Sequence, residues 1–309
     1  MLEINDLVKE YGNFRAVNHL ELTVGEKQIF GFVGPNGAGK TTVMKIMSGL
    51  LRPTAGTVQI NGIDVSQNPR ALKTQIGYMP DFFGVYDNLK VDEYMDFYAG
   101  AYDIPYRDRK GIIANLLEIV NLTDKKEAYV DALSRGMKQR LCLARSLVHD
   151  PKLLILDEPA SGLDPRARVE MKEVLKQLKS LGKTIIISSH ILTELAEMST
   201  IIGIINKGKM VAQGSISDIT KLMNARRRMS LKNLGKTEEL VVLLKEQPDV
   251  TDVSENAAHI EFSFSGDDPA IAQLIKEIVA RDIPIVSIKE NEGNLEEIFM
   301  QLTEGGGSE

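Results

Sequence analysis

The chain lacks several features that would place it in common protein classes. Its 309 residues include a single cysteine, Cys142, so no disulfide can form within the chain, as is usual in a reducing compartment. No run approaches 18 consecutive apolar residues, so no segment reads as a membrane-spanning helix. Residues 1–6 do not open a basic segment followed by an apolar core, and we expect no signal peptide. Lys and Arg number 37 against 43 Asp and Glu, a net charge of −6, which argues against a polyanion-binding protein and leaves open only a local basic patch.

What the chain does contain indicates an α/β fold. With 43% hydrophobic and 26% charged residues, it has the composition of a globular protein long enough for one large domain or two ordinary ones. Three continuous apolar runs, at 28–33, 152–156 and 184–188, are typical of strands buried on both faces. Helical patterns such as 169–181 alternate with the strands, which predicts a parallel sheet covered by helices. A long helical pattern over about 91–149 predicts an inserted helical subdomain.

A second, smaller domain is predicted toward the C-terminus. The polar and basic stretch at 221–229 marks the boundary. Beyond it the patterns follow in the order strand, helix, strand, strand, helix, strand, which is the split arrangement of a small α+β, ferredoxin-like domain. A short helix is expected near 294–302. We therefore predict domains at 1–220 and 221–303, followed by a flexible, glycine-rich tail at 304–309.

The stretch GPNGAGKTT, from Gly34 to Thr42, follows directly after the first buried run. Its pattern, Gly-x-x-x-x-Gly-Lys-Thr, is a P-loop, in which glycines let the backbone curl so that its N–H groups point at phosphate oxygens. Lys40 is expected to reach the β- and γ-phosphates, and the Thr41 hydroxyl to ligate Mg²⁺. A glycine-rich turn without a ligand is the alternative, and the strand before it and the helix after it count against that. The nucleotide-binding residues predicted here are Asn36, Gly37, Gly39, Lys40, Thr41 and Thr42.

Two carboxylates and a histidine follow the other two buried runs. The segment LLILDEP carries Asp157 and Glu158, and TIIISSH ends at His190. Asp157 is expected to hold Mg²⁺, and Glu158 to orient and polarise the attacking water. His190 is placed to reach the γ-phosphate, because such sheets bind ligands at the carboxyl ends of their strands. Taken alone, adjacent acids more often lie in a solvated loop and a single histidine is more often structural, so the catalytic interpretation depends on the P-loop upstream.

A further motif, LSRGMKQRLCLARSL, runs from Leu133 to Leu147. Ser134 and Gly136 stand at the start of a predicted helix. A serine cap and the first N–H groups of that helix would make a second site that faces phosphate. By physics alone this is only a well-capped helix, and its position between the P-loop and the Asp157-Glu158 pair is what makes it diagnostic.

With these motifs in this order, residues 1–220 resemble the nucleotide-binding subunit of an ATP-binding-cassette (ABC) transporter. Tyr11, in YGNFRAV, matches the aromatic residue that stacks on adenine in that family, and Asp164, in SGLD, matches a further nucleotide-site motif. The resemblance implies a P-loop NTPase fold with a mixed sheet and a helical subdomain. It also implies ATP and Mg²⁺ as ligands, and an ATPase whose catalytic residues are Glu158 and His190.

The resemblance also implies how the chain would assemble. In this family two cassettes pair head to tail, and each ATP lies between the P-loop of one cassette and the signature region of the other, here Ser134 and Gly136 acting in trans. The chain has one of each motif, so it is expected to need a second cassette, most simply a copy of itself. The block at 82–100 would receive a short cytoplasmic helix of a separate multi-spanning membrane subunit. That partner would hold the chain at the cytoplasmic face of the cell membrane.

Several positions depart from the family pattern. Asp81 stands where the family usually has a glutamine that touches Mg²⁺ and water, so a carboxylate adds negative charge near the phosphates. It either helps to hold Mg²⁺ through water or points away. Arg135 and Met137 replace the usual glycine and glutamine of the signature. Arg135 either adds a contact across the dimer or is solvated.

The C-terminal pattern resembles the accessory domain of a bacterial export group that moves drugs, lipids, peptides, polysaccharide or ions. The predicted function is therefore the ATPase motor of an ABC exporter. A soluble cassette acting on nucleic acid is one alternative, disfavoured by the single cassette, the lack of a long coiled-coil insertion and the acidic charge, so we expect no nucleic-acid partner. A regulatory cassette that binds ATP without hydrolysing it is the other. Glu158 and His190 argue against it, and Asp81 keeps it open.

Overall fold

The computed structural model describes residues 1–309 except 83, 224–226, 257–258 and 292–309. The described residues form two compact units, one running from Met1 to Ile216 and the other beginning at Ser217. The short helix and the tail that the sequence predicts near the C-terminus lie outside the described residues.

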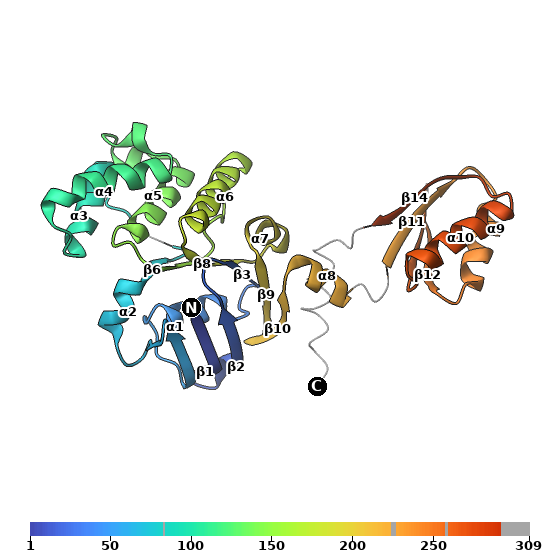
Figure 1. The fold of residues 1–309 in the computed structure, drawn as a ribbon, viewed down its shortest axis with the longest axis horizontal. Helices are drawn as coiled ribbons and strands as arrows, with labels where there is room; N and C mark the ends of the chain where they lie inside the picture. Colours follow the sequence, from blue (N-terminus) through green and yellow to red (C-terminus); the bar gives the residue numbers. More distant parts are fainter. Residues whose placement is uncertain (83, 224–226, 257–258, 292–309) are drawn as a thin grey trace. The chain divides into compact units, whose positions relative to one another are not determined.

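The first unit contains a six-stranded sheet (Figure 1). Its strands are, in order across the sheet, β10 (Lys209–Gly214), β9 (Ile201–Asn206), β3 (Ile29–Val33), β8 (Thr184–Ser189), β7 (Leu153–Leu156) and β6 (Ile76–Met79). All neighbours are parallel except β10, which pairs antiparallel with β9, so the sheet is mixed as expected. Every residue of β3, β7 and β8 is buried, which explains their continuous apolar sequences. Because these three strands are parallel, the segments that follow them meet at one edge of the sheet.

A second, antiparallel sheet of four strands lies beside it in the same unit. Its strands are, in order, β2 (Phe14–Val24), β1 (Leu2–Tyr11), β4 (Ala55–Ile60) and β5 (Ile63–Asp64). Leu2, Leu7 and Leu20 from this sheet share one core with Phe30 of β3 and with Met44 of α1 (Lys40–Met47). The β1–β2 hairpin closes with Tyr11 opposite Phe14, and this turn brings an aromatic pair to the P-loop side of the unit.

The helices of the first unit cover the six-stranded sheet and form a separate helical group. The bounds are α2 (Pro69–Gln75), α3 (Val91–Ala101), α4 (Tyr106–Ile119), η1 (Thr123–Lys125), η2 (Val130–Ala132), α5 (Arg135–Leu147), α6 (Pro165–Ser180) and α7 (Leu192–Met198). Figure 1 shows α3, α4 and α5 together, and each of them contacts the other two. The helical pattern predicted over about 91–149 is divided between α3 and α4 because Asp103 has a φ of +58° and Pro105 follows shortly after it.

The chain passes into the second unit at the start of α8 (Ile216–Met223), and beyond that helix the unit is a four-stranded antiparallel sheet with two helices. Along the chain it consists of β11 (Arg227–Asn233), α9 (Thr237–Glu246), β12 (Val250–Asn256), β13 (His259–Phe264), α10 (Asp268–Ala280) and β14 (Ile285–Asn291). The strand order is β12-β13-β11-β14, and every pair is antiparallel. Leu231 and Phe262 of the sheet pack with Leu240 of α9 and Ile278 of α10. The predicted split α+β arrangement is confirmed.

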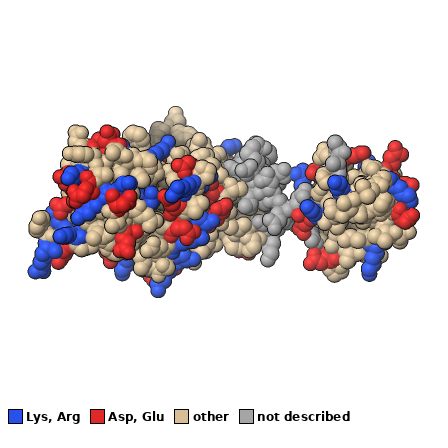
Figure 2. Space-filling model, turned by 90° about the horizontal axis from the view of Figure 1, so that it is seen from above, with Lys and Arg blue, Asp and Glu red and all other residues tan. Residues whose placement is uncertain are grey.

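The surface carries charges of both signs. On the face drawn in Figure 2, Lys and Arg are interspersed with Asp and Glu over the described residues. A protein that binds nucleic acid along a broad face usually gathers its basic residues into a patch or stripe, and this face has no such tract. Within the described part of the chain, no helix has both the length and the apolar sequence that crossing a membrane requires.

Candidate nucleotide site

The loop between β3 and α1 makes the turn that its glycines predict. Gly37 and Gly39 have φ angles of +82° and +107°, a region that favours glycine. A Cβ at Gly39 would also lie 2.5 Å from the carbonyl oxygen of Ala16, so a larger residue would force the two segments apart. Gly39 is the N-cap of α1, and no side chain caps this helix. The loop and the first turn of α1 therefore present backbone at the edge of the sheet in the manner of a phosphate site.

A cavity of about 430 Å³ lies at this edge, within the size range of small-molecule sites. Most of the residues that the sequence predicts for the nucleotide line it. They are Tyr11, Asn36, Gly37, Gly39, Lys40, Thr41, Thr42, Asp81, Glu158 and His190. The remaining lining residues are Phe14, Ala16, Ala38 and Ser161. Asp157, Ser134, Gly136 and Asp164 are not among the residues that line this cavity.

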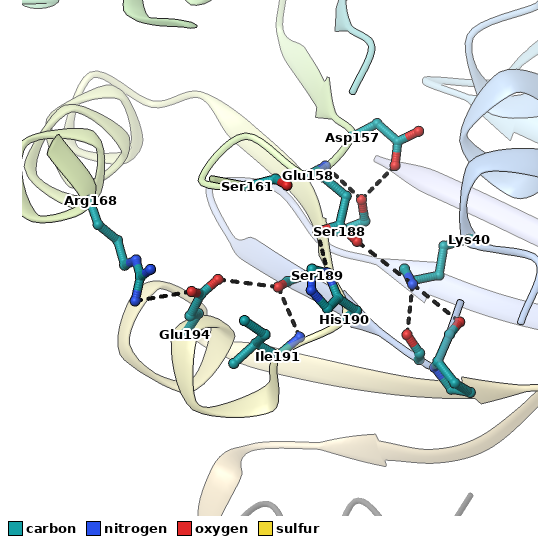
Figure 3. A network of polar contacts seen from close by, with 12 residues as sticks. Lys40, Asp157, Glu158, Ser161, Arg168, Ser188, Ser189, His190, Ile191 and Glu194 are labelled. Carbon is teal, nitrogen blue, oxygen red and sulfur yellow. Dashed lines mark hydrogen bonds and ion pairs between the residues drawn. The ribbon is translucent and has the colours of Figure 1, made fainter. Parts of the chain in front are cut away.

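Lys40 is held at the floor of the loop (Figure 3). Its Nζ donates to the carbonyl oxygens of Gly34, at 2.6 Å, and Pro35, at 3.3 Å, and lies 3.7 Å from Oε1 of Glu158. The side chain is almost fully buried. Burial lowers the pKa of Lys40, and the carboxylates of Glu158 and Asp157 oppose that shift by favouring the ammonium form. A buried ammonium gains most from an anionic partner, which is what the phosphates of a nucleotide supply.

Asp157 directly follows β7, and only one of its two carboxylate oxygens has a hydrogen-bond partner among the described residues. The Ser188 hydroxyl donates to Oδ1 at 2.6 Å, while Oδ2 is buried and has no hydrogen-bond partner among the described residues. The hydroxyl of Tyr78, in the adjacent strand β6, is also buried without a partner there. Burial, helped by the charges of Asp157 and Asp81, raises the pKa of Tyr78. A buried carboxylate oxygen without a partner is costly, so this position favours a cation or a donor.

The donor set fits Mg²⁺ held jointly with a nucleotide. Within the described ranges, no group of three or more His, Cys, Asp or Glu side chains could hold a metal by itself. Mg²⁺ in nucleotide enzymes is usually bound through one or two protein oxygens plus substrate phosphates and waters. The free Oδ2 of Asp157 and the position of Thr41 on the cavity wall match that pattern.

Glu158 lies at the centre of the polar network. Its Oε2 is 2.9 Å from Nδ1 of His190, and its Oε1 faces Lys40. Its N–H donates to Oγ of Ser188 at 2.9 Å, so one hydroxyl links Glu158 to Asp157. Glu158 also has a φ of +50°, a conformation that non-glycine residues rarely adopt. Such an outlier at a cavity edge is typical of a residue held in place for function.

Ser134, Gly136 and Asp164 lie elsewhere in the same unit. Ser134 is the N-cap of α5 and accepts a hydrogen bond from Met137 N at 3.3 Å. Gly136 is buried, and a Cβ there would approach that of Ala167 to 2.9 Å. Asp164 is the N-cap of α6 and accepts from Ala167 N at 2.8 Å. Their predicted contacts with nucleotide stay predictions.

Arg135 is exposed and also contacts a loop of its own chain, while its expected contact across a dimer stays a prediction. Its Nη2 donates to the carbonyl oxygen of Ser161 at 3.0 Å, and Nε2 of Gln139 donates to the same oxygen at 3.2 Å. The guanidinium also lies against Gly162, where it would meet any Cβ. The start of α5 is therefore fastened within the chain to the loop that follows Glu158.

Sequence reasoning missed Ser188, which joins the two acids. The only signal was a serine two positions before His190, inside an apolar strand. Ser188 is 1% exposed. A buried hydroxyl in such a strand needs partners, but the sequence does not say which.

Ser188→Ala tests this link. The substitution leaves the buried Asp157 without its donor and the Glu158 N–H without its acceptor, so we expect the Mg²⁺ concentration for half-maximal ATPase activity to rise at least about tenfold. We also expect a loss of about 1–3 kcal/mol in the free energy of unfolding. Metal titrations of ATPase activity and urea unfolding measure the two effects. Ser146→Ala is the matched control, since Ser146 is equally buried but donates only to the Leu143 carbonyl of its own helix. An unchanged Mg²⁺ dependence in Ser188→Ala would contradict the assignment.

Comparison with known proteins identifies the family. Residues 17–161 match the family described as ABC transporter, and residues 214–303 match the ATP-binding protein DrrA1-3-like C-terminal domain. The chain is 32% identical to the linearmycin resistance ATP-binding protein LnrL of Bacillus subtilis (strain 168), over 98% of each chain. It is 36% identical to the bacitracin transport ATP-binding protein BcrA of Bacillus licheniformis, over 99% of this chain and 98% of the relative. The chain belongs to the ATP-binding proteins of ABC transporters.

Solved structures agree with this assignment. One described as an ATP-binding subunit of an ABC transporter is 29% identical, with a TM-score of 0.65 over 72% of this chain and 93% of that one. Another, cbiO1 of Clostridium perfringens, described as part of the ABC transporter complex cbiONQ, is 26% identical, with a TM-score of 0.64 over 72% and 94%. The predicted family, fold class and ATPase activity are confirmed, and this ABC protein binds and hydrolyses ATP.

Proposed function

We propose that this ABC protein is the ATPase motor of an exporter and drives a separate membrane subunit. The observation that carries the proposal is the cavity at the edge of the parallel sheet, where the P-loop, Asp81, Glu158 and His190 come together. The export assignment rests on relatives that match the chain along nearly its whole length, including the C-terminal domain, and whose names refer to linearmycin resistance and bacitracin transport.

Each group at the proposed site has a distinct part in hydrolysis. The P-loop backbone and Lys40 bind the β- and γ-phosphates, and Thr41 and Asp157 hold Mg²⁺, with Asp81 as a further contact through water. When bound, the metal neutralises charge on the phosphates. Glu158 orients and polarises the attacking water, and Lys40 Nζ and His190 Nδ1 fix its carboxylate. Because Nδ1 of His190 engages Glu158, Nε2 is left for the γ-phosphate.

A second cassette completes the site. Ser134 and Gly136 are not among the residues that line the cavity of their own chain, although Ser134 caps α5 and Gly136 lies in its first turn, where a helix favours an anion. Their phosphate contact therefore requires another cassette facing this one, in a head-to-tail dimer with two sites. Tyr11 and Phe14 are 48% and 62% exposed at the cavity, where an adenine ring can stack.

The surface around α3 is proposed to receive the membrane subunit at the cytoplasmic face of the membrane. Phe82 is 92% exposed, and the half-exposed rings of Tyr86 and Phe97 are in edge contact at 5.4 Å. Phe97 and Tyr106 line a cavity of about 700 Å³ on α3 and α4. Exposed aromatic clusters of this kind usually mark an interaction surface.

Affinity purification from detergent-solubilised native membranes tests the proposal. We expect a stoichiometric multi-spanning protein to co-purify with the intact chain and to be identified by mass spectrometry. Phe97→Asp should abolish that co-purification but keep the ATPase activity of the isolated chain. Leu181→Asp, at a comparably exposed position after α6, should change neither. Recovery of the chain alone, or with ribosomes or DNA-repair proteins, would overturn the transporter motor.

A further inference from the structure

An ion pair with a buried carboxylate lies beside the turn that carries His190 (Figure 3). Nη1 of Arg168, on α6, is 3.1 Å from Oε1 of Glu194, on α7. The Glu194 side chain is 8% exposed, and its carboxylate therefore depends on protein partners. Neither residue lines the nucleotide cavity, and neither has a part in the hydrolysis described above.

The second oxygen of Glu194 connects the pair to the histidine turn. Ser189 Oγ donates to Oε2 of Glu194 at 3.4 Å and accepts from Ile191 N at 3.0 Å. Ser189 and Ile191 are the two neighbours of His190 in the chain, so the network holds the backbone on both sides of the imidazole. The imidazole in turn contacts Glu158 Oε2.

Arg168 connects the same pair to the loop after Glu158. Its Nη2 donates to the carbonyl oxygen of Leu163 at 3.4 Å. Leu163 belongs to the segment from Ser161 to Asp164, and Ser161 lines the nucleotide cavity. Arg168 and Glu194 thus join two segments that flank Glu158: the loop that follows it and the turn that bears its histidine partner.

Fastening α6 to α7 does not by itself explain why the carboxylate of Glu194 is buried. Lys172 and Glu197 join the same two helices one turn further along, at 2.8 Å, through a carboxylate that is exposed. Exposed pairs avoid most of the desolvation cost that a buried carboxylate incurs. Glu194 differs from Glu197 in its contact with Ser189, the residue directly before His190.

We propose that Arg168 and Glu194 are positioning residues for catalysis, which hold His190 against Glu158 and tie it to the Ser161–Asp164 loop. This inference rests on the proposed roles of Glu158 and His190. Glu194→Gln keeps the shape but removes the charge that holds Arg168 and weakens the acceptor of Ser189. A displaced His190 affects the chemical step more than ATP binding, because Lys40 and the P-loop remain in place.

The first experiment compares Glu194→Gln with the matched control Glu197→Gln in the full-length protein. We expect Glu194→Gln to lower kcat at least about tenfold while KM for ATP stays within about twofold, and Glu197→Gln to change neither. Both are measured at a temperature at which thermal unfolding shows each variant to be folded. If Glu194→Gln does not fold, Ser189→Ala replaces it, because it keeps the ion pair and cuts only its link to the histidine turn. Equal kcat values for the wild type and the variant would overturn the proposal.

A double-mutant cycle with His190→Ala shows whether Glu194 acts through His190. In the His190→Ala background, single-turnover rates should be the same, within about twofold, with Glu194 or with Gln at position 194. An equal drop in both backgrounds would show a merely structural role and overturn the inference. Should His190→Ala itself hydrolyse ATP at the wild-type rate, the proposed site assignment fails instead, so the two failures are distinguishable.

Discussion

Glu158→Gln is expected to lower the ATPase turnover number at least about 100-fold, the size of effect seen when a general base is removed. Glutamine has nearly the same shape as glutamate, but a neutral amide cannot polarise the attacking water. The change also removes the negative charge 3.7 Å from Lys40 and the carboxylate that contacts His190. Groups that bind the phosphates are untouched, so ATP should still bind.

Because binding persists while hydrolysis stops, the variant should accumulate with ATP at a closed dimer interface. Size-exclusion chromatography with ATP and Mg²⁺ should show a dimer for Glu158→Gln and a monomer when nucleotide is left out. Glu197→Gln makes the same chemical change on an exposed helix face and should hydrolyse ATP normally. Turnover at the wild-type rate in Glu158→Gln would falsify the assignment of this residue.

The parallel strands were predictable because burial on both faces leaves a continuous apolar sequence. The runs that became β3, β7 and β8 were assigned within one residue at each end. The residues that follow them could then be placed together, since parallel strands end at one edge of a sheet. This is why the P-loop, Glu158 and His190 were expected in one site, and they do line one cavity.

The β9–β10 hairpin was missed although its turn carries a signal. Lys207 and Gly208 have φ angles of +47° and +78°, and Asn206 pairs with Lys209 across a two-residue loop. A type I′ turn requires positive φ at both central residues and therefore prefers Asn-Gly or Asp-Gly there. With lysine at the first central position, the sequence carries only the glycine half of that signal. The helix α2 was missed because its seven residues bury only Leu72.

The links between the site segments were beyond sequence reasoning. Ser188, which contacts both acids, lies 31 positions after Asp157 in the chain, and Arg135 lies 26 positions before Ser161, to which it donates. No local pattern encodes such contacts, because they depend on where two elements lie in the fold. The positive φ of Glu158 is likewise imposed by its surroundings rather than by its residue type.

Lys40→Met is expected to weaken ATP binding by about 10- to 100-fold. Methionine keeps the buried apolar stem and removes the ammonium. A hydrogen bond to a charged group contributes about 1.5–3 kcal/mol, and 1.4 kcal/mol corresponds to a factor of ten in affinity. The fold should survive, since losing the Lys40 donors to Gly34 and Pro35 is offset by no longer burying a cation. Equilibrium binding of a fluorescent ATP analogue at constant Mg²⁺ measures the loss.

The pH dependence of the same measurement tests the ammonium directly. Burial lowers the pKa of Lys40 from its ordinary value of 10.5, so deprotonation and loss of ATP affinity should begin at a lower pH than for an exposed lysine. Wild-type affinity should fall as pH rises through that lowered pKa, and the affinity of Lys40→Met should stay flat over the same range. Lys45→Met, on the exposed face of the same helix, should bind ATP like the wild type at every pH. A Lys40→Met protein with wild-type affinity would show that the phosphates are bound elsewhere, because the substitution removes the ammonium and leaves the P-loop backbone intact.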